Sequence, residues 1–437
     1  MNKKTLTIIL ISLAIADLLG AIDATGVNIA LPKITSDLSI PISISQWIPN
    51  AYTLVLVSTL IFMGKIGDKI GAKKLYLAGL VLFGLASLVL GFTNNPTALI
   101  ATRSVQGLGT AILYTMPMSI IAHLWKEREK AFAVTAAFFA GGMFIGPVVG
   151  GLLTSIDLPN YHGWHLIFLL NVPFIIIGFY IANKYIPKIE TSTEEKLDYL
   201  SILLLFGGLT FIVLSLTIIS KFFILLGLVF LFMLYLYELK VKKPLLDFSL
   251  FKNQTFAFAN FVSFFSMVTM IGMGFVLTFY LQDILKWSPI QTGIAFLPIP
   301  IVTAIFASIG SKVKNWRLGA ITTTILTFSG ISLLTLTNPE TSFFKIVLPG
   351  IILISAGSGL LMTVIFAAIL GSAPTERSGN VSGILNTLQQ IGSMIGIALV
   401  ANIVLQYKLS FEILTIIALA GFICALFVKK HENFQKI

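Results

Sequence analysis

The sequence has little charge, one cysteine and few histidines. Only 11% of its 437 residues are charged, whereas ordinary soluble domains carry roughly 25%. The single cysteine, Cys424, excludes an internal disulfide, and the four histidines are too scattered along the chain to suggest a metal site. These scarcities exclude redox and metal chemistry as the basis of function.

The sequence also lacks the phosphate loop G-x-x-x-x-G-K-[ST], so ATP is not expected to drive the protein. No nucleophile, base and acid can be placed together, and we therefore expect neither an enzyme nor a cofactor. A proton gradient is the expected energy source, since one charge moving through 100 mV carries about 2.3 kcal/mol. Sodium would need several oxygen ligands, which the sequence does not assemble.

Apolar runs are what the sequence has in abundance, because 57% of its residues are hydrophobic. A helix needs about 20 apolar residues to cross the hydrocarbon core of a membrane. The runs predict an all-α polytopic membrane protein with fourteen transmembrane helices. The expected spans lie near residues 5–31, 47–63, 75–93, 97–122, 132–154, 164–185, 199–219, 222–238, 254–281, 290–310, 317–336, 344–371, 380–405 and 411–428.

The order of the spans predicts two six-helix bundles with two inserted helices. We expect an N-terminal bundle at 1–186, the inserted pair with its cytoplasmic loops at 187–252, and a C-terminal bundle with a short cytoplasmic tail at 253–437. The fourth span reads QGLGTAILYT and the twelfth AGSGLLMTVI, which is a faint similarity between the bundles. Two similar bundles are a transporter plan, with a substrate site near the midplane between them. The alternative is that glycine-rich apolar helices look alike by chance.

The positive charges fall on one side of the predicted membrane. With a cytoplasmic N-terminus, the inner segments hold 23 of the 29 lysines and arginines, five lie in outer segments, and Arg103 lies within a span. This is the positive-inside rule. The net charge of +11 therefore indicates a multi-pass protein of the cell membrane with both termini in the cytoplasm, and no nucleic-acid partner. The first residues also imitate a signal peptide, but the apolar run continues to Leu31, which favours a full span.

Three charges interrupt the apolar spans: Asp17, Asp23 and Arg103. A charge at the bilayer centre costs about 2.5 to 3.5 kcal/mol on insertion scales, so each should face a cavity or a partner. At about 1.5 Å per residue, Asp23 lies roughly 12 Å and Arg103 roughly 9 Å from the outer ends of their spans, which lets the two meet. Gln106 follows Arg103 by three residues on the same helix face, where it can orient the pair.

A carboxylate at the position of Asp23 suits proton exchange. Burial disfavours its charged form and a nearby guanidinium favours it, so protonation can follow changes in access to water. The alternative is a static pair with Arg103 that only orients two helices. Asp17 lies near the middle of the membrane and about 120° around the helix from Asp23. Asp17 and Gln106 are candidates for a substrate or second proton site, and the alternative for Asp17 is a residue with no role in transport.

Glycines mark two further places. Gly142, Gly146 and Gly150 recur every fourth residue on one face of the fifth span, where they let another helix approach closely, and Pro147 can bend the span. The alternative is simple packing without a role in the direction of transport. In the inner loop after the second span, two glycines and one acid among lysines indicate a tight loop that docks on a neighbouring helix end.

Over nearly its whole length the chain resembles the major facilitator superfamily, specifically its fourteen-span drug:proton antiporters. The chain departs from the family pattern at Gly26, which replaces a branched residue, at Ala72, which replaces a basic one, and at Gln389, which replaces a frequent arginine. The similar stretches are DATGVNIALP at 23–32, GKIGDKIGAKK at 64–74, RSVQGLG at 103–109, GMFIGPVVGG at 142–151, GWHLIFLLNVP at 163–173, YLQDILKWSPIQTGIAFLP at 280–298 and GNVSGILNTLQQIGSMIGIAL at 379–399.

The resemblance implies roles for residues in these stretches. It implicates Asp23 in proton coupling, with Arg103 assisting. The inner gate loop would contain Gly64, Asp68, Gly71 and Lys73. The antiporter motif of the fifth span would contain Gly142, Gly146, Pro147, Gly150 and Gly151.

The sequence as a whole predicts an antiporter that exports lipophilic, often cationic drugs in exchange for protons by alternating access. Its expected partners are small lipophilic drugs, organic cations, protons and membrane lipids, and the expected state is a monomer. The seventh span is crowded with phenylalanine and methionine, which suit varied lipophilic ligands or simply face lipid. The alternatives are a tetracycline-type exporter and a lipid or metabolite transporter of the same fold.

Overall fold

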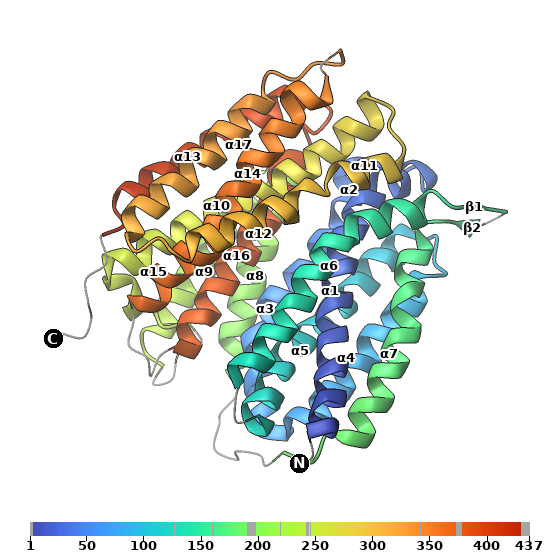
Figure 1. Cartoon of the computed structure of the whole chain (residues 1–437), viewed down its shortest axis with the longest axis vertical. Helices are drawn as coiled ribbons and strands as arrows, with labels where there is room; N and C mark the ends of the chain where they lie inside the picture. The colour runs from blue at the N-terminus through green and yellow to red at the C-terminus, as the bar shows by residue number, and fades with distance from the viewer. Residues whose placement is uncertain are drawn as a thin grey trace. The chain divides into compact units, whose positions relative to one another are not determined.

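The structure, a computed structural model, is built of helices (Figure 1). It describes residues 3–125, 128–159, 161–189, 198–218, 220–241, 244, 246–340, 342–372 and 378–429. Within these ranges the strands are a single antiparallel pair, β1 (Asp157–Leu158) and β2 (Tyr161–His162). The all-α class expected from the apolar runs is therefore confirmed.

Helices cover the places where the sequence predicts membrane spans. Thirteen helices in the described part of the chain are long and apolar enough to cross a membrane. The expected span at 47–63 lies in α3, a further helix of 24 residues. The helices are α1 (Lys3–Asp37), α2 (Ile42–Ser45), α3 (Trp47–Ile70), α4 (Ala72–Leu90), α5 (Pro96–Leu124), α6 (Arg128–Thr154), α7 (His165–Tyr185), α8 (Tyr199–Ile218), α9 (Lys221–Glu238), η1 (Phe248–Lys252), α10 (Gln254–Phe279), η2 (Tyr280–Ile284), α11 (Pro289–Ala295), α12 (Pro298–Gly310), α13 (Trp316–Leu334), η3 (Phe343–Val347), α14 (Leu348–Leu360), η4 (Leu361–Ile365), α15 (Phe366–Gly371), α16 (Ser378–Ala401) and α17 (Tyr407–Leu426).

The chain forms two compact units. The first unit holds residues 1–206 together with 288–294, and the second holds 207–287 together with 295–437. The division at 1–186, 187–252 and 253–437 stays a prediction.

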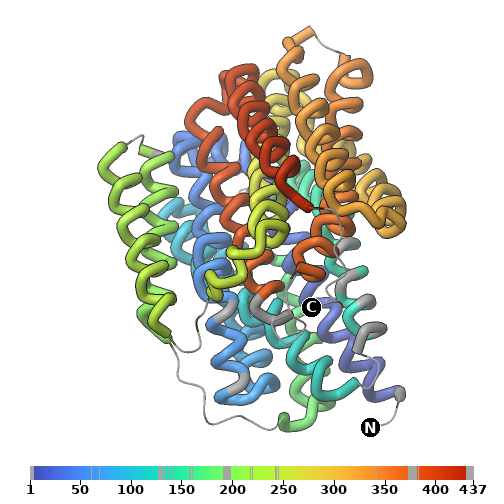
Figure 2. The backbone as a smooth tube through the Cα atoms, turned by 90° about the vertical axis from the view of Figure 1, so that its left-hand side faces the viewer, coloured from blue at the N-terminus to red at the C-terminus, as the bar shows by residue number. Residues whose placement is uncertain are grey.

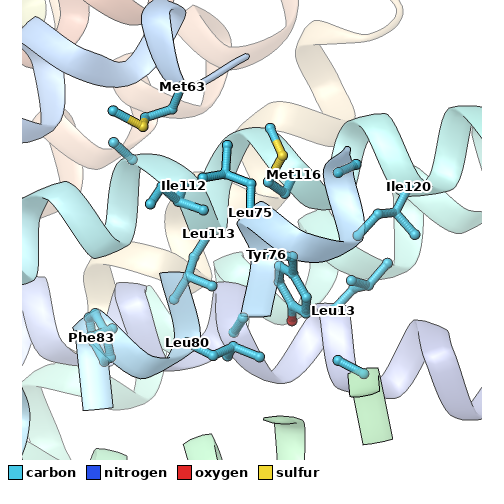
Figure 3. Close-up of a cluster of buried hydrophobic side chains, with 14 of the residues drawn as sticks. Leu13, Met63, Leu75, Tyr76, Leu80, Phe83, Ile112, Leu113, Met116 and Ile120 are labelled. Carbon is cyan, nitrogen blue, oxygen red and sulfur yellow. The ribbon is translucent and has the colours of Figure 1, made fainter. Parts of the chain in front are cut away.

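The core of the first unit lies between α1, α3, α4 and α5 (Figure 3). Leu13 from α1, Met63 from α3 and Met116 from α5 meet the apolar face of α4 there. Tyr76 of α4 is fully buried, and its hydroxyl donates to the carbonyl of Ser12 at 3.1 Å. This bond satisfies the one polar atom that the tyrosine brings into the core, and it fixes α4 against α1.

The inserted helices α8 and α9 run side by side (Figure 2). Gly208 of α8 packs against Leu231 of α9, and Gly227 of α9 packs against Ile212 of α8. The Asn402 side chain donates to the carbonyl of Leu216 at 2.8 Å, which ties the end of α8 to the residue that follows α16 within the second unit. One face of α9 carries large exposed apolar side chains, as a helix in contact with lipid would.

Local sequence explains where several helices begin and break. Asn95 caps α5 by accepting from the Ala98 N–H at 3.1 Å, and Pro96 takes the first helical position. The expected span at 290–310 is interrupted between α11 and α12, just before Pro298. Proline lacks an N–H and restricts the preceding residue, so the helix restarts there rather than running through.

Candidate functional site

Buried polar side chains from four helices of the first unit meet around Asp23 of α1. Ser87 comes from α4, Arg103 and Gln106 from α5, and Asn171 from α7. The exposed fraction of each of these five side chains is at most 1%. A polar group buried in an apolar surrounding is costly unless it is hydrogen-bonded, so this cluster must be judged by its partners.

Asp23 and Arg103 form the ion pair that depth counting along the two helices predicts. Arg103 Nη1 donates to Asp23 Oδ2. The Arg103 Nε group donates to the carbonyl of Ile48 at 3.2 Å, and the Tyr52 ring lies 4.2 Å from the guanidinium carbon. Helix α3 therefore supplies both a carbonyl and an aromatic face for the buried cation.

Gln106 orients the pair, as its spacing from Arg103 suggests. Its Oε1 atom accepts from Arg103 Nη1, and its Nε2 atom donates to Asp23 Oδ1 at 3.1 Å and to Ser87 Oγ at 2.9 Å. Both ends of the amide are engaged, so Gln106 is fixed in one orientation.

Asn171 and Ser87 belong to the same network, and sequence reasoning assigned them no role. Asn171 Nδ2 donates to Asp23 Oδ1 at 3.1 Å and to Ser87 Oγ at 3.4 Å. Asn171 Oδ1 is buried and accepts no hydrogen bond from the residues that the structure describes. The sequence signal was the amide itself, which stands alone among apolar residues in the stretch FLLNVP.

Asp17 lies apart from this cluster. Its side chain is half-buried and forms neither a hydrogen bond nor an ion pair with the residues that the structure describes. Gly20, one turn further along α1, packs against the Tyr114 ring, where an added Cβ would come 3.2 Å from Cε1. Asp17 thus shares no hydrogen-bond partner with Asp23 among the described residues.

The glycines of α6 face two different helices. Gly142, Gly146 and Gly150 lie against α1, and the two helices run side by side (Figure 1). A Cβ added to Gly142 would come 2.5 Å from the Leu18 carbonyl oxygen. By contrast, the carbonyl of Pro147 faces Gly293 of α11. Gly151 likewise packs against Pro289, at the start of the same helix.

The stretch that is expected to form the inner gate loop contains a sharp turn between α3 and α4. Gly71 has a φ of 98°, a conformation that favours glycine, and it ends α3. Lys73 Nζ donates to the Asn183 carbonyl at the end of α7, at 2.8 Å, so the loop does dock on a neighbouring helix end. Gly64 lies inside α3 with open space beside it. The side chain of Asp68 lies outside the described residues.

The C-terminal end of α1 carries a third acid that is engaged. Asp37 accepts from Lys33 Nζ at 3.0 Å, and His162 Nδ1 of the β1–β2 hairpin lies 3.0 Å from its other oxygen. The side chain of His162 is 39% exposed, so this contact is open to water. Among the described residues, no group of three histidines, cysteines or acids is placed to hold a metal ion.

Comparison with known proteins decides the family. The family model described as "Major Facilitator Superfamily" matches residues 13–397. The chain belongs to the major facilitator superfamily. This membership makes it a multi-pass membrane transporter and not an enzyme.

Relatives within the superfamily match most of the chain. The riboflavin transporter RibZ of Clostridioides difficile is 29% identical over 91% of this chain and 88% of its own length. The puromycin resistance protein pur8 of Streptomyces alboniger is 30% identical over 90% of this chain and 81% of its own. The multidrug transporter protein MdtP of Bacillus subtilis is 30% identical over 92% and 75%.

Solved structures share the major facilitator fold at low sequence identity. The human organic anion transporter MFSD10 matches with a TM-score of 0.65 and 15% identity, over 97% of this chain and 99% of its own. A peptide transporter POT in complex with sulfate matches with a TM-score of 0.70 and 16% identity, over 96% and 93%. At these identities the likeness shows the fold alone.

Proposed function

We propose that the protein is a proton-coupled exporter of lipophilic, often cationic compounds, working as a monomer with both termini in the cytoplasm. The observation that carries the proposal is the setting of Asp23, a carboxylate with 0% exposure in a membrane-spanning helix, held by donors from α5 and α7. Its protonated and ionised forms favour different surroundings, because only the ionised form compensates Arg103. A proton-driven transporter needs such a group.

In the proposed cycle, Asp23 takes up a proton from outside and loosens its bond to Arg103. The guanidinium keeps the Ile48 carbonyl, Gln106 Oε1 and the Tyr52 ring as partners, so it can stay buried while Asp23 is neutral. Protonation therefore shifts the balance between two arrangements of the helices, and the proton leaves to the cytoplasm as the substrate is exported.

Drug substrates are the class that several relatives support. The puromycin resistance protein and the multidrug transporter each align over at least three quarters of their own lengths with this chain. A methyl viologen resistance protein of Salmonella typhimurium, named for an organic dication, is 27% identical over 91% of this chain. We propose that Asp17, half-buried and unpaired within the described residues, attracts the cationic members of this class.

In the proposed cycle, α1 and α6 move relative to one another at their contact. Glycines leave two backbones in contact without interlocking side chains, so the helices can shift along one another with little repacking. Because α1 carries Asp23, such a shift would couple the carboxylate to the inner gate loop and to access from either side.

A second candidate function is vitamin transport, which the riboflavin transporter among the relatives favours. Riboflavin is a flat, polar, uncharged ring system, so it would gain nothing from the charge of Asp17. Transport of riboflavin and of organic cations can therefore be separated by one variant, Asp17→Asn.

Reconstituted protein tests both candidates. Proteoliposomes that contain a pH-sensitive dye would receive ethidium, methyl viologen, puromycin, tetracycline, riboflavin and a neutral lipophile in turn. We expect organic cations to trigger proton movement in the wild-type protein and in Asp37→Asn, which removes a different acid of α1, but not in Asp23→Asn. Folding of each variant is checked by size-exclusion chromatography.

Each alternative has its own outcome. Drug-coupled proton movement that persists in a folded Asp23→Asn protein would remove Asp23 from the coupling mechanism. A response to riboflavin alone would replace drug export with vitamin transport. Tetracycline alone, or lipid alone, would assign the protein to the corresponding transporter of the same fold.

A further inference from the structure

Asn171 brings into the Asp23 cluster a buried hydrogen-bonding atom that has no partner among the described residues. Its Nδ2 group donates to Asp23 Oδ1 and to Ser87 Oγ, while its Oδ1 atom has no donor among the described residues. Gln106, which makes the same two donations, has its oxygen engaged by Arg103. A half-turn of the Gln106 amide would break that bond, whereas a half-turn of the Asn171 amide gives up only its two Nδ2 donations and moves Nδ2 to the position that Oδ1 now occupies.

Protonation of Asp23 adds a hydrogen-bond donor for which the observed arrangement provides no acceptor. An ionised carboxylate only accepts hydrogen bonds, but a protonated one carries an O–H that must donate. The three groups that contact Asp23 all present N–H donors: Arg103 Nη1, Gln106 Nε2 and Asn171 Nδ2. A buried donor without an acceptor is strongly disfavoured, so one of these groups has to change.

We propose that the side-chain amide of Asn171 rotates when Asp23 is protonated. In the ionised state Asn171 Nδ2 donates to Asp23, as observed. In the protonated state Asn171 Oδ1 takes its place and accepts the carboxyl proton. The Ser87 hydroxyl, which accepts from Asn171 in the first state, then turns and donates to the same oxygen. The proposal rests on proton uptake by Asp23 and names the residue that stabilises the protonated form.

The elements around Asp23 bring two other titratable side chains near it, Tyr52 of α3 and Tyr114 of α5, and neither is hydrogen-bonded to Asp23 in the described structure. Helix α5 contributes Arg103, which has no acceptor, and α3 contributes Tyr52, which lies over the guanidinium. Helix α4 contributes the hydroxyl of Ser87. Helix α6 packs Gly142, Gly146 and Gly150 against α1, and Asp17 of α1 itself lies elsewhere around the helix.

Two variants distinguish an amide that rotates from one that only donates. In Asn171→Leu the ionised carboxylate keeps two donors, whereas the protonated form loses its acceptor. The midpoint of the pH dependence of drug-driven proton movement should therefore fall by about one pH unit, a tenfold loss of proton affinity. A residue that only donates predicts a rise instead. In Asn171→Thr the hydroxyl can donate or accept, so the midpoint should return toward the wild-type value.

Infrared spectroscopy tests the rotation in the unaltered protein. Protein labelled with ¹³C at the asparagine side-chain carbonyl would be acidified, and the pH-difference spectrum recorded. We expect one labelled carbonyl band to move to lower wavenumber as the Asp23 carboxyl band appears, because that carbonyl begins to accept a hydrogen bond. The shift should vanish in Asn171→Leu and persist in Asn260→Leu, a control for a fully buried asparagine of α10 whose oxygen is likewise unpaired in the described structure.

The results separate this proposal from the one on which it rests. An Asp23 carboxyl band that appears without any shift of a labelled asparagine carbonyl overturns the role of Asn171 and leaves proton coupling intact. A rise of the midpoint in Asn171→Leu does the same. The absence of any carboxyl band that Asp23→Asn removes overturns both proposals together.

Discussion

Gly26 in α1 and Gly150 in α6 pack backbone against backbone. A Cβ added to Gly150 would come 2.5 Å from Gly26 Cα, and one added to Gly26 would come 3.4 Å from Gly150 Cα. The sequence shows Gly26 only as a departure from the family pattern. The structure gives its physical reason, since even a Cβ at this position would lie 3.2 Å from the Gly146 carbonyl oxygen, and a larger side chain would push the two helices apart.

This contact predicts that the α6 glycines packed against α1 tolerate no methyl group. In Gly146→Ala the new Cβ would collide with Thr25 Oγ1 and lie 3.1 Å from Ile22 Cα. Overpacking of this kind costs about 1 to 3 kcal/mol, so the melting temperature and the transport rate should both fall. In the control Gly141→Ala the Cβ meets only Leu18 Cδ1 at 3.9 Å, and no loss is expected. Equal melting temperatures of the two variants would contradict the prediction.

The inner loop predicts opposite effects at its two glycines. Gly71→Ala forces a Cβ into a backbone with φ of 98°, which should destabilise the protein by about 1 to 3 kcal/mol. Gly64→Ala fills open space within a helix and should stabilise it by about 0.5 to 1 kcal/mol. Thermal denaturation in detergent measures both. If Gly71→Ala has the same melting temperature as the wild-type protein, the loop adopts another conformation in solution.

The ion pair predicts a ranking of substitutions at Arg103. Arg103→Lys keeps the charge but loses the planar fork that bonds Asp23, Gln106 and the Ile48 carbonyl together, at a cost of about 1 to 3 kcal/mol. Arg103→Ala leaves Asp23 uncompensated and should cost about 3 to 5 kcal/mol. The double variant Asp23→Ala with Arg103→Ala should melt above Arg103→Ala alone. The reverse order would show that the pair is not coupled.

We predict that loss of the Asp17 charge changes the KM for charged substrates but not for neutral ones. Because the structure gives it no partner among the described residues, Asp17→Asn should fold as well as the wild-type protein. Loss of the charge should raise the KM for methyl viologen about tenfold, if the carboxylate contributes about 1.4 kcal/mol to its binding. The KM for a neutral lipophile should not change. Equal effects on the two substrates would exclude Asp17 from cation recognition.

Sequence could predict the parts of this protein that depend on composition and helical spacing. The helical class and the contact of Asp23 with Arg103 and Gln106 followed from apolar runs, depth and the three-residue step. The π-helical segments η2, η3 and η4 were not foreseen, because one extra residue in a turn leaves the apolar pattern almost unchanged.

The rest of the site depends on contacts between distant parts of the chain. Asn171 and Ser87 join the cluster from α7 and α4, and neither residue type is unusual in a membrane helix. The sequence does not indicate which helix packs against Gly26, because glycine has no side chain whose chemistry would suggest a partner. The docking of Lys73 on Asn183 likewise joins positions 110 apart in the chain.

The enclosure of Asp23 has a consequence for the electrical cost of transport. With no exposed surface, the carboxylate cannot touch a drug in this state, so in the proposed cycle drug and proton influence each other through the protein. In that cycle the number of protons is set by the cluster and not by the charge of the drug. With one proton exchanged, export of a monovalent cation moves no net charge, export of a neutral compound moves one, and only the latter draws on the membrane voltage as well as on the pH difference.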